Sequence, residues 1–149
     1  MNKFEKVVLI TGCAGFIGAA LSKRFLEANF KVIGIDNLNN YYDRQLKYDR
    51  LKDIENSVKN KKYLWDFFKI SVENILEIND IFSKNKPNIV INLAAQAGVR
   101  FSIKNPASYV KSNLNGFFNI LDNCKNHNVD HLVYASSSSV YGGNNDYPF

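Results

Sequence analysis

Cysteine, proline, methionine and tryptophan are all scarce: the 149 residues contain two, three, one and one of them. Two cysteines are too few for the disulfide framework of a small secreted domain. No apolar run reaches the roughly 18 residues that a membrane-spanning helix needs. The first residues lead directly into a strand-like segment, which predicts that the chain carries no signal peptide. We therefore expect a cytoplasmic protein with no membrane partner.

Hydrophobic residues make up 46% and charged residues 22% of the chain. This balance is typical of one folded domain and not of a disordered, collagen-like or coiled-coil chain. A net charge of +5 is compatible with nucleic-acid binding. The basic residues are scattered, however, and their one tight group is Lys59, Lys61 and Lys62. We therefore expect no nucleic-acid partner.

Short apolar runs alternate with amphipathic stretches of helical length. The apolar runs predict five buried strands, at residues 7–11, 31–35, 63–70, 89–93 and 129–136. The stretches between them predict helices at residues 15–28, 43–57, 72–84 and 106–126. Leu46, Leu51 and Ile54 are the recurring apolar residues of the second helix, and Pro106 opens the last one at a first-turn position.

Strand–helix alternation of this kind favours an α/β fold, a Rossmann-like doubly wound parallel sheet with about five strands and helices on both faces. Residues 1–149 then form one NAD(P)-binding domain. A complete dinucleotide fold normally has a sixth strand, so we expect the later strands to be absent and the fifth strand to have an uncovered edge.

The segment TGCAGFIG at residues 11–18 lies between a predicted strand and a predicted helix, the context in which a glycine motif is informative. Gly12 permits a tight turn, Gly15 lets a pyrophosphate approach the backbone, and Gly18 allows close packing of the helix on the sheet. The helix start then offers N–H groups and a partial positive charge to phosphates. The segment therefore predicts a dinucleotide site.

Asp36 stands at the end of the second predicted strand, 18 residues after Gly18. A carboxylate in this position accepts hydrogen bonds from the adenosine ribose, and the alternative is a turn aspartate in Asp36-Asn37. A 2′-phosphate about 4 Å from this carboxylate costs roughly 4 kcal/mol at an effective dielectric constant near 20. Asp36 therefore favours NAD over NADP.

Five segments, TGCAGFIG, DNLNNYYD, NLAAQAGVRFSIKNP, YVKSNLNGFFNIL and HLVYASSSSVYGG, together resemble the NAD-dependent epimerase/dehydratase family of extended short-chain dehydrogenases. The resemblance covers nearly the whole chain, and within the family it is nearest to the UDP-glucuronate 4-epimerase branch. It implies NAD as the cofactor, a UDP-sugar as the substrate, and 4-epimerisation by transient oxidation and reduction at C4. It also implies a homodimer, for which the helix from Pro106 is a candidate.

The resemblance also implies which residues hold the dinucleotide. They are Gly12, Gly15, Phe16, Ile17 and Gly18 at the pyrophosphate, Asp36, Asn37, Ser71 and Val72 at the adenosine, Leu93, Ala94 and Ala95 after the fourth strand, Asn113 on the long helix, and Ala135 and Ser136 at the nicotinamide half. Relatives have an aspartate where Ser71 stands, so serine is expected to hold adenine less firmly.

Ser137 matches the serine or threonine of the family's catalytic triad. It follows a central strand of the predicted sheet, where open parallel sheets bind ligands, and its hydroxyl both donates and accepts hydrogen bonds. Without the resemblance, residues 136–139 are also consistent with a polar loop. Ser138 and Arg100 are candidates for substrate binding, and Arg100 is equally consistent with a surface loop.

The resemblance places the triad's Tyr-x-x-x-Lys motif about 25 residues after Ser137, which is beyond Phe149, the last residue of this sequence. The sequence from Tyr48 to Lys52 has that spacing, but it lies on a predicted outer helix and we interpret it as coincidence. The chain therefore resembles the amino-terminal part of a roughly twofold longer enzyme, without the substrate domain. A non-catalytic dinucleotide-binding module is the alternative. Ser138-Ser139, in place of an acidic pair, disfavours a dehydratase.

Two other groups of residues suggest chemistry that we do not expect. His127 and His131 flank Asp130, but they straddle a helix end and a strand start and predict a solvated turn rather than a metal site. Cys13 lies near a helix start, where a thiol can become reactive, but it is also a small residue suited to a tight loop. We predict no bound metal.

Overall fold

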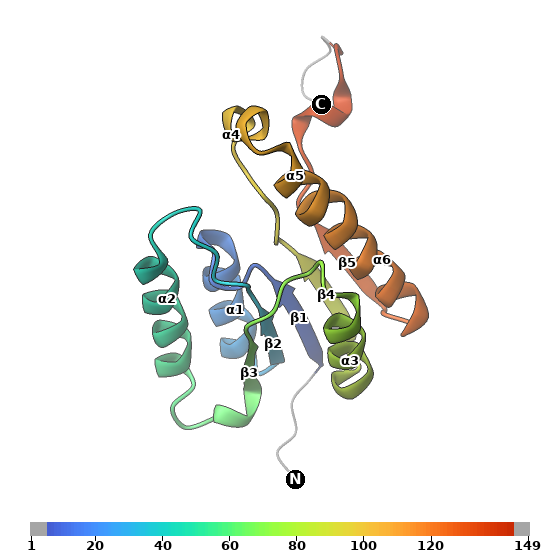
Figure 1. Ribbon diagram of the computed structural model, residues 1–149. Helices are drawn as coiled ribbons and strands as arrows, with labels where there is room; N and C mark the ends of the chain where they lie inside the picture. The colour runs from blue at the N-terminus through green and yellow to red at the C-terminus, as the bar shows by residue number, and fades with distance from the viewer. Residues whose placement is uncertain (1–5, 145–149) are drawn as a thin grey trace.

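Five apolar segments form the strands of one parallel sheet in the computed structural model, which describes residues 6–144 (Figure 1). Their order across the sheet is β3-β2-β1-β4-β5, with every neighbouring pair parallel. This order confirms the predicted doubly wound sheet. The strands are β1 (Val7–Thr11), β2 (Lys31–Ile35), β3 (Trp65–Phe68), β4 (Ile89–Asn92) and β5 (His131–Tyr134).

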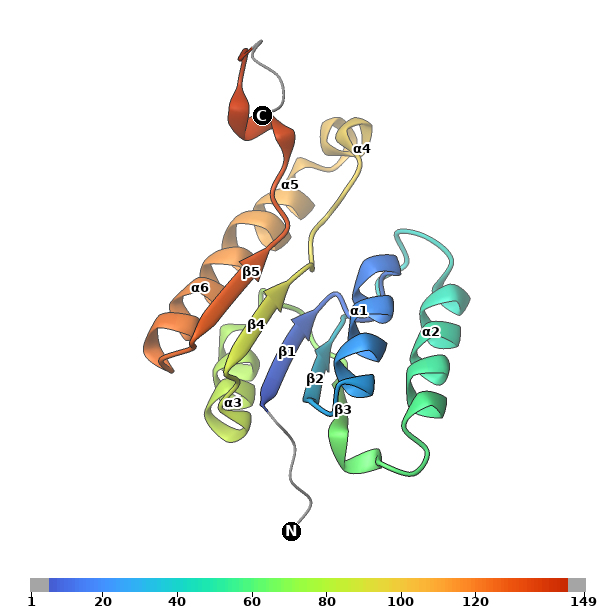
Figure 2. The same ribbon diagram turned by 180° about the vertical axis from the view of Figure 1, so that it is seen from behind.

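Helices cover both faces of the sheet, with α1 (Phe16–Glu27) and α2 (Arg44–Ser57) on one face and α3 (Ile75–Asn85) and α6 (Phe117–Asn126) on the other (Figures 1 and 2). The side chains of β1 alternate between the two faces, as the pleat of a strand requires. Val8 and Ile10 pack in the core beneath α1 and α2, whereas Val7 and Leu9 pack in the core beneath α3 and α6. The sheet is thus buried on both sides, which explains its continuous apolar strands.

The helix predicted at residues 106–126 consists of three consecutive pieces. It begins at Pro106 as α5 (Pro106–Tyr109), continues as the π-helical segment η2 (Val110–Gly116), and ends as α6. Single π-helical turns inside helices are frequent at functional sites. A short helix that the sequence did not predict, α4 (Val99–Lys104), precedes it, and two single turns of 3-10 helix, η1 (Lys62–Leu64) and η3 (Ser138–Tyr141), complete the described elements.

The buried side of α2 includes two of the three recurring apolar residues and one lysine. Lys47, Leu51 and Ile54 are buried, whereas Leu46 is 48% exposed. The spacing of Lys47, Leu51 and Ile54 places them on one stripe of the helix, and Leu46 lies one residue off that stripe. Of the three recurring apolar residues, Leu46 therefore lies outside the buried stripe, and Lys47 lies within it.

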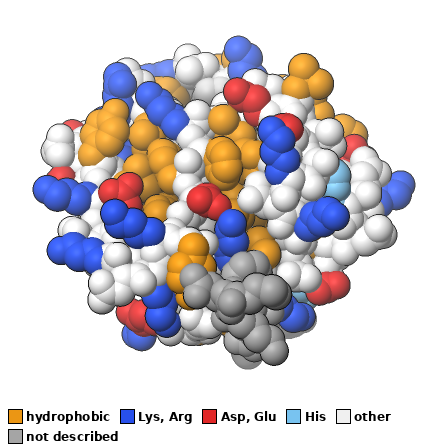
Figure 3. All heavy atoms as spheres, turned by 90° about the horizontal axis from the view of Figure 1, so that it is seen from below, with side chains coloured by type: hydrophobic (Ala, Val, Ile, Leu, Met, Phe, Trp, Pro, Cys, Tyr) orange, Lys and Arg blue, Asp and Glu red, His pale blue; other side chains and the backbone are white. Residues whose placement is uncertain are grey.

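β5 pairs with β4 and with no other strand in the described part of the chain, so its outer edge is uncovered there, as predicted. On the face in Figure 3, Lys and Arg side chains are scattered over the surface and interspersed with acidic ones. Within residues 6–144 no helix has the length and apolar character needed to cross a membrane.

Candidate dinucleotide site

The glycine-rich loop joins β1 to α1 at the carboxyl edge of the sheet. Gly12 has a φ of +69°, a conformation that L side chains rarely adopt, and its carbonyl accepts a hydrogen bond from the amide of Gly15 at 2.9 Å. A Cβ on Gly18 would lie 2.2 Å from the same carbonyl oxygen. Gly15 is the N-cap of α1, and no side chain caps this end of the helix. The loop thus presents an open helix start to an anion.

A cleft of about 180 Å³ opens beside this loop, between the ends of β2 and β4. In a doubly wound sheet this is the place where the strand order reverses and where ligands bind. Eight of the predicted cofactor residues line the cleft, namely Gly12, Gly15, Asp36, Asn37, Val72, Leu93, Ala94 and Ala95. Phe16, Ile17 and Gly18 form the first turn of α1 next to it.

Thr11 connects the ends of β1 and β4 on the floor of the site. Its hydroxyl donates to Oδ1 of Asn92 at 2.6 Å and accepts from the amides of Leu93 at 3.1 Å and Ala94 at 3.0 Å. This side chain, together with the carbonyl of Thr11, which also accepts from the amide of Leu93 at 3.3 Å, holds the turn that begins the 93–97 segment. These hydrogen bonds to the amides of Leu93 and Ala94 keep both residues at the wall of the cleft.

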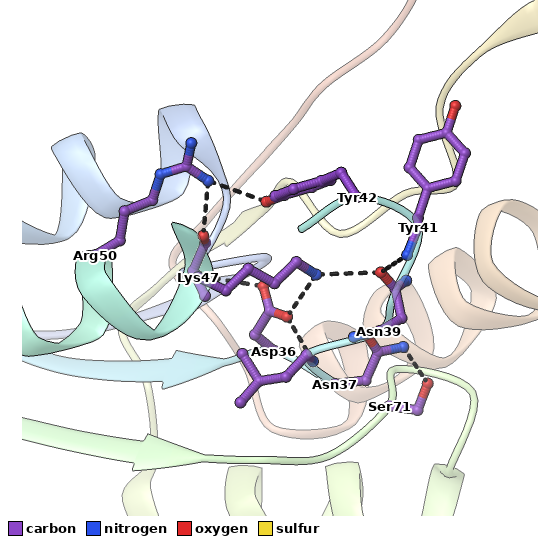
Figure 4. A network of polar contacts seen from close by, with 10 residues as sticks. Asp36, Asn37, Asn39, Tyr41, Tyr42, Lys47, Arg50 and Ser71 are labelled. Carbon is purple, nitrogen blue, oxygen red and sulfur yellow. Dashed lines mark hydrogen bonds and ion pairs between the residues drawn. The ribbon is translucent and has the colours of Figure 1, made fainter. Parts of the chain in front are cut away.

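The carboxylate of Asp36 is buried and accepts three hydrogen bonds from the protein (Figure 4). Its Oδ2 accepts from the amide of Ala14 at 3.2 Å, which ties the carboxylate to the glycine-rich loop. Its Oδ1 accepts from the amide of Leu38 at 2.8 Å and from Nζ of Lys47 at 3.3 Å. Asp36 therefore joins the loop after β1, the loop after β2 and helix α2.

Tyr42 and Arg50 extend the network beyond the pair of Lys47 and Asp36 (Figure 4). Nζ of Lys47 also donates to Oδ1 of Asn39 at 3.2 Å and lies 5.1 Å from the ring centre of Tyr42. Arg50 donates to the hydroxyl of Tyr42 at 3.0 Å and to the carbonyl of Ala14 at 3.2 Å. Tyr42 thus covers the lysine amine and is itself held by Arg50.

Ser71 belongs to a second polar network, which links three elements beside the cleft. The side-chain amide of Asn37 donates to Oγ of Ser71 at 3.2 Å, and the hydroxyl of Ser71 donates to the carboxylate of Glu73. The hydroxyl of Ser112, in the π-helical segment, donates to the other carboxylate oxygen of Glu73 at 2.6 Å. Because both hydroxyl protons point to Glu73, the free positions on both serines are lone pairs.

Asn113 lies in the same π-helical segment and does not line the cleft. Its Oδ1 accepts from the amide of Gln96 at 2.8 Å, and its Nδ2 donates to the carbonyl of Gln96 at 3.0 Å. This two-point contact holds the 93–97 segment against the helix. Asn113 therefore acts on the cleft through the backbone that lines it.

The structure places the remaining predicted residues away from this cleft. Ala135, Ser136, Ser137 and Ser138 follow β5 as an exposed segment. Ser137 is the N-cap of η3, and its Oγ accepts from the amide of Ser139 at 3.2 Å. Arg100 is exposed on α4, where it borders a separate shallow hollow with Tyr41 and Lys104. Tyr48 and Lys52 lie on α2, at the opposite end of the sheet from β5 (Figure 1).

Cys13 is fully buried beneath the loop. Burial, and secondly the charge of Asp36, raise the pKa of its thiol well above the ordinary value, so Cys13 is a packing residue.

His127 contacts Oδ1 of Asn79 at 3.2 Å and the ring of Phe82. Among residues 6–144, no group of three or more metal-ligating side chains comes together.

The fold and this cleft define a dinucleotide-binding domain. Comparison with known families shows which kind: residues 8–149 match the NAD dependent epimerase/dehydratase family, and the chain belongs to that family. The predicted family is thereby confirmed, and its dependence on NAD agrees with the predicted cofactor.

Individual relatives agree with this assignment. The chain is 48% identical over 142 residues to Protein CapI of Staphylococcus aureus, covering 95% of this chain and 41% of that protein. It is 43% identical over 135 residues to the UDP-glucuronate 4-epimerase of Thermodesulfobacterium geofontis, covering 91% of this chain and 40% of that enzyme. The chain thus spans about two fifths of the length of these relatives.

A solved structure matches the fold. The UDP-glucose 4-epimerase of Bifidobacterium longum, crystallised with NAD⁺ and UDP, superimposes with a TM-score of 0.80 at 28% identity. The match covers 96% of this chain and 40% of that enzyme. The matched portion is again about two fifths of the length of the longer enzyme.

Several residues of the cleft were not predicted from the sequence. They are Asn39, Tyr41, Tyr42, Lys47, Gln96, Ala97 and Ser112. The signal for Lys47 was present, because it occupies an apolar position of the α2 pattern, four residues before Leu51. The others lie in loops or in the π-helical segment, whose side-chain directions no simple periodicity predicts.

Proposed function

We propose that this chain is the dinucleotide-binding part of an NAD-dependent UDP-sugar 4-epimerase that acts on UDP-glucuronate. One observation carries the proposal: the open start of α1 and the carboxylate of Asp36 flank a single cleft at the switch point of the sheet. Membership of the family and 43% identity to a UDP-glucuronate 4-epimerase support it.

The residues of the cleft fit the parts of NAD. The glycine-rich loop lacks Cβ atoms where a pyrophosphate approaches, and its uncapped helix start supplies N–H groups to phosphate oxygens. Oδ2 of Asp36 keeps one lone pair after accepting from Ala14, which suits one ribose hydroxyl. The cleft also has an apolar wall, formed by Leu93, Ala94 and Val72, for the adenosine and the rest of the dinucleotide.

When bound, NAD supplies a site that takes a hydride from a sugar carbon and returns it to the opposite face. In this proposal, Ser137 holds the sugar C4 oxygen, donating to it as a ketone and accepting from it as an alcohol. Removal of the hydroxyl proton requires a base with a lowered pKa. We place this base in a Tyr-x-x-x-Lys motif outside residues 1–149, in a protein of the relatives' length.

The test begins with NAD, because binding does not depend on the sugar. The protein of the relatives' length is purified and titrated with NAD by calorimetry, then supplied with UDP-glucuronate or UDP-glucose, and the 4-epimers are identified by NMR. UDP-galacturonate is the expected product. Binding of NAD without any epimer would instead favour a non-catalytic dinucleotide module, and turnover of UDP-glucose alone would contradict the glucuronate assignment.

Ser137→Ala tests the role of the hydroxyl. Epimerisation is expected to fall by about 10²- to 10⁴-fold while NAD binding is unchanged, because the serine contacts only the sugar. Ser83→Ala is the matched control, since Ser83 is an exposed serine on α3. Equal rates for both variants would remove Ser137 from the mechanism.

A homodimer and a reducing, cytoplasmic location belong to the same proposal. Exposed apolar side chains recur along one side of the long helix, at Val110, Leu114, Phe118 and Leu121. Their spacing of four, four and three residues is that of a helix stripe, and such a stripe is suited to pairing with a second copy. Both cysteines are free and buried, which is consistent with a reducing compartment.

A further inference from the structure

Lys47 is the one buried lysine among residues 6–144, with 5% of its surface exposed. A buried ammonium group is costly unless it is paired and hydrogen-bonded. Here Nζ lies 3.3 Å from Oδ1 of Asp36 and 3.2 Å from Oδ1 of Asn39 (Figure 4). Both partners come from the segment that follows β2.

Fold stability does not explain why this pair is present. Replacing a buried ion pair by apolar side chains of similar volume is often neutral or stabilising. The neighbouring positions Leu51 and Ile54 show that this side of α2 accepts apolar residues. The location of the pair is more informative, because Asp36, Asn39 and Lys47 all line the cleft.

The pair changes what the cleft presents to a ribose. Leu38 and Lys47 together occupy Oδ1 of Asp36, so the carboxylate offers its free lone pair on Oδ2. At the same time, the charge of Lys47 offsets the charge of Asp36. The repulsion that Asp36 alone would exert on a 2′-phosphate is therefore reduced, and a cation stands beside it.

We propose that Lys47 determines how this cleft discriminates between NAD and NADP. Paired with Lys47, Asp36 is oriented toward an unphosphorylated ribose. Released from Asp36, Lys47 is a resident cation for a 2′-phosphate, so the cleft contains a phosphate-binding site that the carboxylate masks. This inference rests on the proposed binding of a dinucleotide in the cleft.

The experiment measures dissociation constants of NAD and NADP by calorimetry and compares their ratio between variants. Asp36→Asn keeps the shape of the side chain and removes its charge. We expect the ratio of NADP to NAD dissociation constants to fall by about tenfold or more, because Lys47 is then free to pair with the phosphate. In the double variant Asp36→Asn/Lys47→Met this gain for NADP is expected to disappear.

Lys47→Gln provides a test of opposite sign with Asp36 intact. The same ratio is expected to rise by about tenfold, because the charge of Asp36 is no longer offset. Lys52→Met is the matched control, since Lys52 is an exposed lysine on the same helix, and its ratio should equal that of the unmodified protein. A thermal melt of each variant without ligand establishes that it is folded.

The proposal is overturned if Asp36→Asn and the double variant give the same ratio within about twofold, or if Lys47→Gln leaves the ratio unchanged. These outcomes are distinct from failure of the proposed function. If the unmodified protein binds neither dinucleotide, the cleft itself is misassigned. If it binds NAD and the ratios do not move, the role of Lys47 alone is rejected.

Discussion

Thr11 and Asn92 lie 81 positions apart in the chain, and their side chains meet in a buried 2.6 Å hydrogen bond between the ends of β1 and β4. The same hydroxyl accepts from the amide of Ala94, at the wall of the cleft. The hydroxyl of Thr11 is therefore one of the groups that hold the turn after β4, together with the carbonyl of Thr11 and the side chain of Asn113. Thr11, the last residue of β1, thus also shapes the cleft.

Thr11→Val removes that oxygen with almost no change of volume. Oδ1 of the buried Asn92 then loses its donor, and the amide of Ala94 loses its acceptor, so the free energy of unfolding is expected to fall by about 2–3 kcal/mol. Urea unfolding measures this loss, and Thr11→Ser, which keeps the hydroxyl, is the control. A loss below about 0.5 kcal/mol for Thr11→Val would contradict the assigned role.

Gly18→Ala tests the close contact between α1 and the glycine-rich loop. The new Cβ would lie 2.2 Å from the carbonyl oxygen of Gly12, so loop or helix has to shift. We expect about 1–3 kcal/mol of destabilisation and at least about tenfold weaker NAD binding. Gly143→Ala is the control, because nothing lies within 4 Å of a Cβ there. Unchanged NAD affinity in Gly18→Ala would separate this contact from binding.

Features that depend on burial or on backbone geometry could be predicted from the sequence, whereas features that depend on contacts between distant residues could not. Strands and most helices were predicted because burial on two faces leaves apolar runs in a strand and periodic stripes in a helix. The glycine-rich loop and Asp36 were predicted because their spacing reflects backbone geometry. Lys47 was missed because a lysine is assumed to be exposed, and its burial depends on an aspartate 11 positions away.

The long helix shows a second reason for failure. Apolar spacing alone predicts one regular helix there, whereas Ser112 and Asn113 lie in a π-helical segment. Their contacts are with Glu73 and with the backbone of Gln96, which belong to other parts of the chain. Such a local change of helix type is decided by tertiary contacts that no window of sequence contains.

The burial of Cys124 predicts a pH dependence of stability. Burial raises the pKa of this thiol to about 11, whereas an unfolded thiol ionises near pH 8.5. Above about pH 8.5 the unfolded chain releases this proton and the folded chain keeps it, so stability that is present at lower pH is lost as the pH rises toward 11. Over pH 8 to 10, Cys124→Ala should therefore lose less stability than the unmodified protein, by on the order of 1 kcal/mol in urea unfolding. Parallel stability curves for the two proteins would refute this linkage.

The stripe on the long helix leads to a prediction about assembly. Leu114 is 64% exposed at the centre of the stripe, and Leu76 on α3 is 79% exposed outside it. Placing a glutamate in a paired apolar face leaves a buried charge without a partner, whereas a glutamate on a solvated face costs little. Leu114→Glu is therefore expected to sediment as a monomer, and Leu76→Glu as a dimer like the unmodified protein.

Sedimentation velocity gives the masses, and a thermal melt of each variant shows that a smaller mass does not come from unfolding. If Leu114→Glu remains dimeric while folded, the two copies do not meet through this stripe. A monomeric unmodified protein would reject the homodimer itself. A two-fold symmetric interface contains the same residue from each copy. Leu114→Glu therefore places two glutamates in the interface, whereas Leu76→Glu places none there. The two variants should consequently differ clearly in sedimenting mass.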